Sequence, residues 1–391
     1  MLTLLSVLVG VTGFNLFQGY QTDTLGSLAD SAVYGEALGH LVLMKEGASL
    51  RGKVQEAAYM FTGADLAVVR DALAGFREVD FGAPRLLLEG LITDGRASLV
   101  FFGLGMEPAT YRRFRARFGY AGEGQELTPE RPRGGQVARD LAAILDLDVG
   151  GGATLFSSTL AGRLNAVDMD VIGVFDTGSA ATNDKFVVVP LGLARDLYGT
   201  DGAHQVAVVL ADPADAPRVG PAIADALRRR GVPVEVRDWE SMSAFFRGVR
   251  QLYGMIFGFL FLIVATVVVM SVLNTMTMAV MERAREIGTL RALGMRPGAV
   301  QRLFAAEGLV LGLAGAAGAT VTTLLVGGLI NAARITYRPP GISAEVPLYV
   351  ALDPGEMVGT GVGVAVLCGL VSLVPARRTA RLEVVDALRH V

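Results

Sequence analysis

Apolar residues concentrate in four stretches of the chain, one at its start and three in its last third. A helix needs about 20 mostly apolar residues to cross a bilayer. Residues 1–20, 251–281, 303–332 and 356–374 meet that length. The pattern therefore predicts four transmembrane helices, with one large insertion between the first and the second.

Residues 1–20 allow two interpretations. A signal peptide would carry a basic segment before its apolar core and small residues at a cleavage site, and neither is evident here. We therefore favour a membrane helix. The stretch begins at the initiator methionine and so lacks a cytosolic flank. Either the true start lies upstream or this helix is short on its inner side.

Arginines beside the apolar stretches predict which side each loop faces, because positive residues accumulate in cytosolic loops. Two segments are rich in them: residues 282–302 contain Arg283, Arg285, Arg291, Arg296 and Arg302, and residues 375–391 contain Arg377, Arg378, Arg381 and Arg389. Both segments and the N-terminus are predicted to be cytosolic. Residues 21–250 and the loop 333–355 are then outside, and the chain is expected to be a multi-pass protein of the inner (cytoplasmic) membrane.

The insertion, residues 21–250, has the pattern of an α/β domain. Asp94-Gly95 is a hairpin signal, and Asp212-Pro213 can cap and begin a helix that reaches Arg230. Strands are predicted at residues 86–92, 97–104, 167–171, 186–189, 206–210 and 232–236, and further helices at 64–76 and 137–145. The Gly- and Pro-rich residues 121–135 suggest two lobes joined there. The predicted fold is a membrane protein with four transmembrane helices and a two-lobed extracytoplasmic α/β domain.

Composition and charge argue against an ordinary soluble protein and against nucleic acid as a partner. Charged residues make up 19% of the chain, against about 25% in an average soluble protein. The net charge of -3 offers no basic excess for nucleic acid. The single cysteine, Cys368, rules out an internal disulfide, and the three histidines have no metal-ligand spacing.

No catalytic or cofactor-binding motif stands out in the sequence. Gly150-Gly151-Gly152 lacks the lysine and Ser/Thr of a Walker A phosphate loop and is interpreted as a tight turn. Four aspartates of a β region are better explained as solvent-facing residues than as metal ligands: Asp168, Asp170, Asp176 and Asp184. We expect no catalytic, cofactor or metal site, and hence a non-catalytic subunit.

Residues 281–304 are the most informative segment. Met281, Ala284, Ile287 and Leu290 recur at threes, which predicts one apolar side of a short helix. Gly294 can end that helix in a left-handed cap, and Pro297 can open the next one. The charged residues point in other directions: Glu282, Arg283, Arg285, Glu286 and Arg291. The residues alone leave two hypotheses open, a helix that meets lipid headgroups and a helix that docks a cytosolic ATPase.

The run from Glu282 to Gly294, ERAREIGTLRALG, resembles the signature of the MacB/FtsX-type ABC permeases, which include the lipoprotein-releasing permeases. Further similar phrases lie along nearly the whole chain: Asn274 to Met278, Glu307-Gly308, Pro375 to Arg378, Asp386 to Arg389, Val171 to Phe175 and Asn183-Asp184. The resemblance implies a four-helix permease that works as a dimer and transmits motion without a substrate channel through its helices.

The resemblance also implies the partners of this chain. They are a cytosolic ABC ATPase dimer, which would bind ATP and magnesium, a second permease that is identical or different, and a periplasmic client or adaptor. The residues expected to dock the ATPase are Glu282, Arg283, Arg285, Glu286, Ile287, Gly288, Leu290, Arg291 and Gly294. Lipoprotein release or export of an amphiphile is the leading hypothesis. The alternatives are a MacB-like efflux component, an FtsX-like regulator of a cell-wall hydrolase, and a membrane-anchored sensor without a motor.

Four residues are expected to hold the helices together. Gly308 and Gly312 have the spacing that lets two helices approach closely. Glu307 lies near the inner membrane edge, where an acid is costly unless it is paired, and an ion pair with an arginine of the docking segment is favoured over a proton path. Asn274 is expected to form an interhelical hydrogen bond. No proline occurs between Ser243 and Gly294, so a stiff helix can run from the insertion to the cytosol.

Overall fold

The computed structural model describes residues 2–52, 56–118, 122–338 and 345–380. The chain forms two compact units. The helical unit is drawn from residues up to Gly26, from Val249–Tyr337 and from Pro347 onward, and the inserted domain comprises Ser27–Gly248 together with a part of the segment Arg338–Val346. Arg381, Arg389 and the ending from Asp386 to Arg389, which the sequence singled out, lie outside the described residues.

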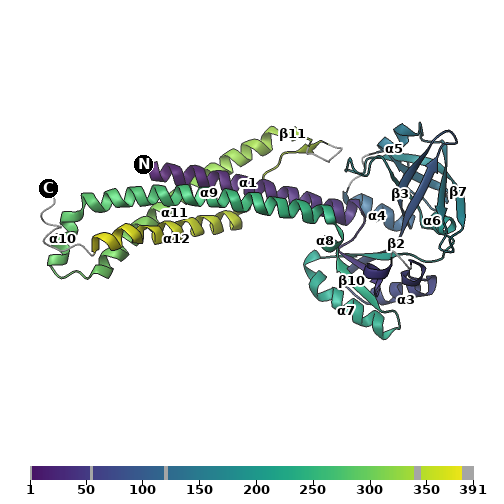
Figure 1. Ribbon diagram of the computed structural model, residues 1–391, viewed down its shortest axis with the longest axis horizontal. Helices are drawn as coiled ribbons and strands as arrows, with labels where there is room; N and C mark the ends of the chain where they lie inside the picture. The colour runs from purple at the N-terminus through teal and green to yellow at the C-terminus, as the bar shows by residue number, and fades with distance from the viewer. Residues whose placement is uncertain (1, 53–55, 119–121, 339–344, 381–391) are drawn as a thin grey trace. The chain divides into compact units, whose positions relative to one another are not determined.

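Among the described residues, four helices of the chain are long and apolar enough to cross a membrane. They are α1 (Leu2–Asp30), α9 (Ala244–Glu282), α11 (Pro297–Ala333) and α12 (Pro354–Ala380) (Figure 1). A short helix, α10 (Ala284–Ala292), follows α9, and the short strands β11 (Thr336–Tyr337) and β12 (Val346–Pro347) lie between α11 and α12 in the sequence.

Helix α9 is longer than a membrane crossing requires. It has 39 residues and contains no proline, and at about 1.5 Å per residue it measures roughly 58 Å. The hydrocarbon core of a bilayer is about 30 Å thick. The predicted stiff helix is therefore present as one uninterrupted element.

Small residues and aromatic contacts hold the helical unit together. Phe14 of α1 and Phe257 of α9 have ring centroids 4.5 Å apart. A Cβ built on Gly315 of α11 would lie 2.6 Å from Val7 of α1. Helix α1 thus packs against both α9 and α11, while α11 also packs against α12 through further glycines.

The inserted domain has one mixed sheet. Among the described residues it has ten strands, in the order β10-β1-β9-β2-β3-β8-β5-β7-β4, and β6 pairs with β2 and β7. The strands are β1 (Leu41–Lys45), β2 (Val79–Thr93), β3 (Ser98–Met106), β4 (Gly122–Gly124), β5 (Gly134–Ala138), β6 (Gly152–Ser158), β7 (Leu164–Phe175), β8 (Phe186–Pro190), β9 (Gln205–Leu210) and β10 (Val234–Asp238).

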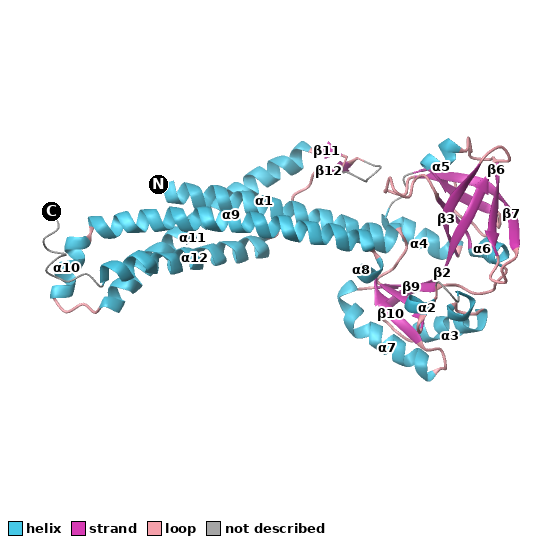
Figure 2. Ribbon diagram, viewed as in Figure 1, coloured by secondary structure: helices cyan, strands magenta, loops and turns pink. Residues whose placement is uncertain are grey.

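Longer and shorter helices pack around the strands of the inserted domain (Figure 2). The longer ones are α3 (Gly63–Leu73), α4 (Pro108–Phe118), α5 (Arg139–Ile144), α6 (Leu191–Tyr198) and α7 (Ala216–Arg229). The shorter ones are the π-helix η1 (Ser31–Gly35), α2 (Ala48–Arg51), α8 (Trp239–Met242), and the 3-10 helices η2 (Glu56–Tyr59) and η3 (Pro213–Asp215).

Most predicted elements of the insertion are confirmed. Strands β2 and β3 pair across the Asp94-Gly95 turn, and the Asp212 carboxylate accepts a hydrogen bond from Ala214 N–H at 2.9 Å, as a helix cap should. The helix predicted at residues 137–145 is wrong at its start. Val137 lies in β5, where it pairs with β7 and β8, because a strand buried on both faces has no polar alternation.

The two lobes are formed differently from the prediction. One core gathers residues of β1, β9, β10, α3 and α7, and another gathers residues of β2, β3, β5 to β8, α5 and α6. The chain does not divide at residues 121–135, because β2 pairs with β9 through Arg85 and with β3 beyond it. One lobe is thus built from both ends of the insertion, and a single 15-residue strand connects it to the other lobe.

Buried His40 should make the stability of the inserted domain depend on pH. Its Nδ1 accepts a hydrogen bond from Leu210 N–H at 2.9 Å, so Nε2 carries the proton and faces the Tyr34 hydroxyl. Burial, and then the charge of Arg117, lower the pKa of His40 from 6.5, while Asp30 and Asp212 oppose this shift.

Because the folded domain favours neutral His40, its contribution to stability is present above pH 6.5 and is lost as the pH falls through the lowered pKa of the folded state. We expect the midpoint temperature of unfolding to decrease as the pH is lowered from 7.5 to about 5. The decrease should be smaller in a His40→Gln variant. Equal slopes of midpoint against pH in the two proteins would contradict this.

Candidate functional site

A sharp bend joins α9 to α11. Helix α9 ends at Glu282, Arg283 leaves helical geometry with φ -100° and ψ 13°, and α10 begins at Ala284. Gly294 has φ +96° and ends α10. Its N–H donates to Arg291 O and Met295 N–H donates to Leu290 O, both at 3.0 Å, which is the Schellman pattern.

Pro297 is the first residue of α11 and follows Arg296 in extended geometry. The predicted helix, bend and return are therefore confirmed. We call residues 282–296 the elbow, and Figure 1 shows α10 where α9 and α11 are joined.

One side of α10 is anchored in the core of the helical unit. Ile287 and Gly288 are buried, and Ile287 shares a core cluster with Val280, Val300 and Phe304. The predicted apolar side is only partly correct, because Met281 is exposed and Leu290 is 39% exposed. The break at Arg283 separates Met281 from α10, and the buried side then follows the spacing of three and four residues through Ala284, Ile287, Gly288 and Arg291.

The other side of α10 is exposed and carries charges of both signs. The exposed residues of the elbow include Glu282, Arg283, Arg285, Glu286, Leu290, Leu293 and Gly294. Glu286 lies in the first turn and Arg291 in the last, which suits the helix dipole. Leu293, 82% exposed, was missed by the sequence analysis. Leu293 continues the spacing of threes, and its position at the end of α10, next to the capping glycine, is the signal that could have indicated its exposure.

Glu307 of α11 ties the elbow to its second helix. Arg283 Nη1 lies 3.6 Å from Glu307 Oε1, with both side chains partly exposed. This is the ion pair that the sequence favoured for Glu307. Such a half-exposed pair contributes at most about 1 kcal/mol, so its main effect is to fix the break at Arg283 relative to α11.

The other three helix-packing candidates differ in their surroundings. A Cβ on Gly308 would lie 2.8 Å from Cys368 O, and one on Gly312 would lie 2.6 Å from Ala365 Cα, so both face α12. Asn274 is exposed on α9 and forms no side-chain hydrogen bond with any residue that the structure describes. The interhelical partner predicted for it is therefore not found in the described part of this chain.

The inserted domain shows no metal cluster within the described residues. Gly150 has φ +97° and precedes strand β6, so the triple glycine is a turn into a strand and not a phosphate loop. Asp168 accepts a hydrogen bond from Thr154 at 2.8 Å, and Asp176 is buried and pairs with Arg139 at 3.2 Å. Both aspartates have structural partners in the domain, and the expectation that Asp176 faces solvent is wrong, because its carboxylate is buried.

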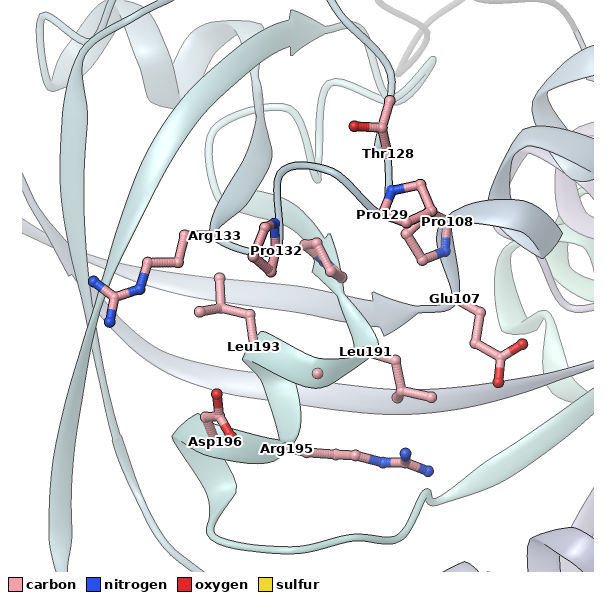
Figure 3. A pocket seen from close by; sticks show the side chains of 12 residues that line it. Glu107, Pro108, Thr128, Pro129, Pro132, Arg133, Leu191, Leu193, Arg195 and Asp196 are labelled. Atoms are coloured by element: carbon pink, nitrogen blue, oxygen red, sulfur yellow. The ribbon is translucent and has the colours of Figure 1, made fainter.

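A hollow of about 460 Å³ lies between the first turns of α4 and α6. Figure 3 shows Pro129 and Pro132 on the loop side and Leu191 and Leu193 on α6. Its charged lining includes Glu107, which pairs with Arg70 at 3.4 Å, and Arg195, whose Nε donates to Gly202 O at 3.1 Å. Because both signs are present and these two charges are engaged, the hollow does not define a ligand.

Replacing Gly294 should loosen the elbow. A side chain at a positive φ costs about 1–2 kcal/mol, so Gly294→Ala should raise the open population of this turn roughly tenfold. Cleavage by trypsin after Arg291 should accelerate by the same factor. The matched control is Gly298→Ala, since Gly298 lies in α11 with no atom within 4 Å of a built Cβ. Equal cleavage rates in the two variants would contradict the prediction.

Comparison with known proteins identifies this arrangement. Residues 257–384, which include the elbow, α11 and most of α12, match the FtsX-like permease C-terminal family. The chain is 28% identical over 243 residues to the lipoprotein-releasing system transmembrane protein LolC of Neisseria meningitidis, covering 56% of this chain and 55% of that protein. It is 24% identical over 412 residues to the macrolide export ATP-binding/permease protein MacB of Bdellovibrio bacteriovorus, covering 100% of this chain and 59% of that protein.

Solved structures of the outer domain are also similar. The periplasmic region of MacB from Actinobacillus actinomycetemcomitans has a TM-score of 0.39 at 11% identity, covering 54% of this chain and 93% of that one. The extracellular domain of the transporter YknZ has a TM-score of 0.38 at 16% identity, covering 51% and 99%.

The resemblance to the MacB/FtsX-type permeases and the predicted fold class are confirmed. Residues 257–384 carry the FtsX-like permease C-terminal match, and the chain is similar to the permeases LolC, MacB and YknZ. It spans 55% to 64% of the length of the LolC relatives that it matches.

Proposed function

We propose that this chain is a permease subunit that transmits ATP-driven motion from cytosolic ATPase subunits to its extracytoplasmic domain. The observation that supports this most is the elbow. Its inner side is anchored by Ile287, its end is fixed by the Schellman turn at Gly294, and its outer side presents Glu286 and Arg285 to solvent. A rigid, charged surface of this kind suits docking of a protein better than contact with lipid headgroups, which would not require the glutamates.

The elbow is connected to two long helices, so a push on it would move both. Its start continues from α9, and its end runs into α11 through Pro297. The Arg283–Glu307 pair joins the two sides. Because α9 has no break in 39 residues, displacement at the elbow would be carried along α9 with little loss to bending.

The orientation follows from the arginines of residues 282–302 and 375–391. In this proposal the elbow and both termini are cytosolic, the chain crosses the inner membrane at residues 1–20, 251–281, 303–332 and 356–374, and residues 21–250 are outside. ATP and magnesium would be bound by the separate ATPase dimer, and a second permease would complete the complex.

The client is proposed to be a lipoprotein or another amphiphile. The names of the Neisseria and Xylella relatives, which describe a lipoprotein-releasing system, support this class. A MacB-like efflux component with a periplasmic adaptor is the second candidate, since MacB relatives match as much as 100% of this chain. The large two-lobed insertion counts against an FtsX-like regulator of a cell-wall hydrolase.

Co-purification tests the proposal. The full chain, extracted in mild detergent, should retain an ATPase with a Walker A motif and a second permease copy or homologue. It should also retain a lipoprotein or other amphiphile under the first hypothesis, or a periplasmic adaptor under the second. Recovery of the chain without any nucleotide-binding protein, after crosslinking in intact cells, would contradict it and favour a sensor without a motor.

A further inference from the structure

The inserted domain carries a hollow on the exposed face of β2, β3 and β6. Its volume is about 890 Å³, which is the size of many small-molecule sites. Leu91 of β2 pairs with Val100 of β3 on one side and with Phe156 of β6 on the other, which makes a row of apolar side chains across three strands. Val100 is 58% exposed, and apolar rows of this kind are seldom left open without a ligand or partner.

The hollow is rigid because β2 is held tightly on both sides. Glu89 N–H donates to the Tyr198 hydroxyl at 3.0 Å, and Ser157 Oγ donates to Glu89 O at 2.7 Å. A Cβ on Gly90 would lie 2.0 Å from Phe156 O, so only glycine permits this approach of β2 and β6. The floor of the hollow is therefore preformed.

Charge in the hollow has one sign. Sixteen described residues line it, and the acidic ones are Glu56 and Glu89, with no lysine or arginine among the sixteen. Glu89 is exposed, lies between Leu87 and Leu91 on the outer face of β2, opposite Phe102, and forms no ion pair with any described residue.

Glu56 is hydrogen-bonded to a histidine beside the hollow. His204 Nδ1 accepts a hydrogen bond from Leu87 N–H at 3.1 Å, and its Nε2 is hydrogen-bonded to the Glu56 carboxylate. Burial raises the pKa of the Tyr198 hydroxyl, and the negative charges of Glu56 and Glu89 add to that rise.

We propose that this hollow binds a cationic amphiphile, with its apolar chain on the row Val100, Leu91 and Phe156 and its ammonium group beside Glu89. A neutral hydrocarbon would leave Glu89 desolvated without a partner, and an anionic amphiphile would be repelled by both carboxylates. The proposal rests on the proposed function only in taking the amphiphile to be the client, because binding itself needs no motor.

The test uses the full chain in phosphatidylcholine nanodiscs with an environment-sensitive dye on Leu164→Cys at the rim. The native Cys368 is buried, and the chain without the added cysteine is the labelling control. Octyltrimethylammonium and octyl sulfate, which have equal chain lengths, are titrated. We expect a saturable response to the ammonium alone, a Kd about tenfold weaker in Glu89→Gln, and an unchanged Kd in Glu130→Gln, an exposed carboxylate outside the hollow.

A Glu89→Lys variant should reverse the preference toward octyl sulfate, which shows that the hollow is intact when ammonium binding is lost. The proposal is overturned if both titrants give the same unsaturated drift in all variants, as lipid partitioning would, or if Glu89→Gln binds the ammonium as well as the parent. Co-purification of an ATPase is independent of this result, so failure of the hollow and failure of the motor proposal are told apart.

Discussion

Exchanging the charges at Glu286 and Arg291, by Glu286→Lys with Arg291→Glu, is expected to reduce stimulation of the partner ATPase to its basal rate. Both residues lie on α10, and Glu286 is fully on its exposed side. Like charges brought together in a protein interface cost several kcal/mol, which is enough to undock the elbow. The net charge of the chain is unchanged, and the measurement is ATP hydrolysis by the reconstituted complex.

Two controls separate docking from folding in this experiment. Asp225→Lys with Arg229→Glu makes the same exchange on the exposed side of α7 and should leave ATPase stimulation intact. Thermal unfolding of every variant is measured alongside, and loss of stimulation is assigned to docking where the unfolding midpoint is kept. If the variant with exchanged charges at Glu286 and Arg291 stimulated the ATPase as the parent chain does, the assignment of the elbow as the docking surface would be contradicted.

Filling the contact between α11 and α12 is expected to destabilise the helical unit strongly. A Cβ on Gly312 would lie 2.6 Å from Ala365 Cα and 3.0 Å from Cys368 Cβ. Since the first of these is a backbone atom, the two helices must separate, and Gly312→Val should lower the free energy of unfolding by about 3 kcal/mol. The measurement is unfolding of the purified chain in detergent by heat or by added dodecyl sulfate.

Gly328→Ala is the matched control for this prediction. Gly328 lies in the same helix, but no atom is within 4 Å of a Cβ built on it, so the change should be neutral or stabilise α11 by up to about 1 kcal/mol. Gly312→Ala should fall between the two. Equal stability of Gly312→Val and the parent would show that α11 and α12 do not pack here.

The parts of the structure that were predicted correctly are those set by local chemistry. Four long apolar runs predict four helices because backbone groups in lipid must be satisfied within the segment. Gly294 and Pro297 predict the elbow because each acts through its own backbone, one by accepting a positive φ and the other by opening a helix. Asp212 and the Asp94-Gly95 turn are local signals of the same kind.

The parts that were missed depend on residues far apart in the sequence. The division of the inserted domain follows from pairing of β2 with β9, which no local pattern indicates. Val137 was assigned to a helix because a fully buried strand and a helix look alike in an apolar run. The buried side of α10 differs from the predicted one at Met281 and Leu290. The reason is the break in the helix at Arg283, which the spacing of apolar residues does not indicate.

No pattern in the sequence predicts the hollow near Glu89. Leu91, Val100 and Phe156 come from three strands, and only their registers place them in one row. Each residue alone fits an ordinary half-buried strand. The candidate site at the elbow, by contrast, is continuous in sequence, which is why it could be predicted before its geometry was known.

Site-specific photocrosslinking from the elbow tests the central claim most directly. A photoreactive residue replaces Leu293 in the full chain, in living cells, and Leu164 of the inserted domain, also strongly exposed, is replaced as the control. If motion enters the permease through the elbow, position 293 forms an adduct with a nucleotide-binding ATPase and position 164 does not. An elbow that forms no such adduct, or that reacts with a membrane-impermeant reagent added outside the cell, contradicts the account.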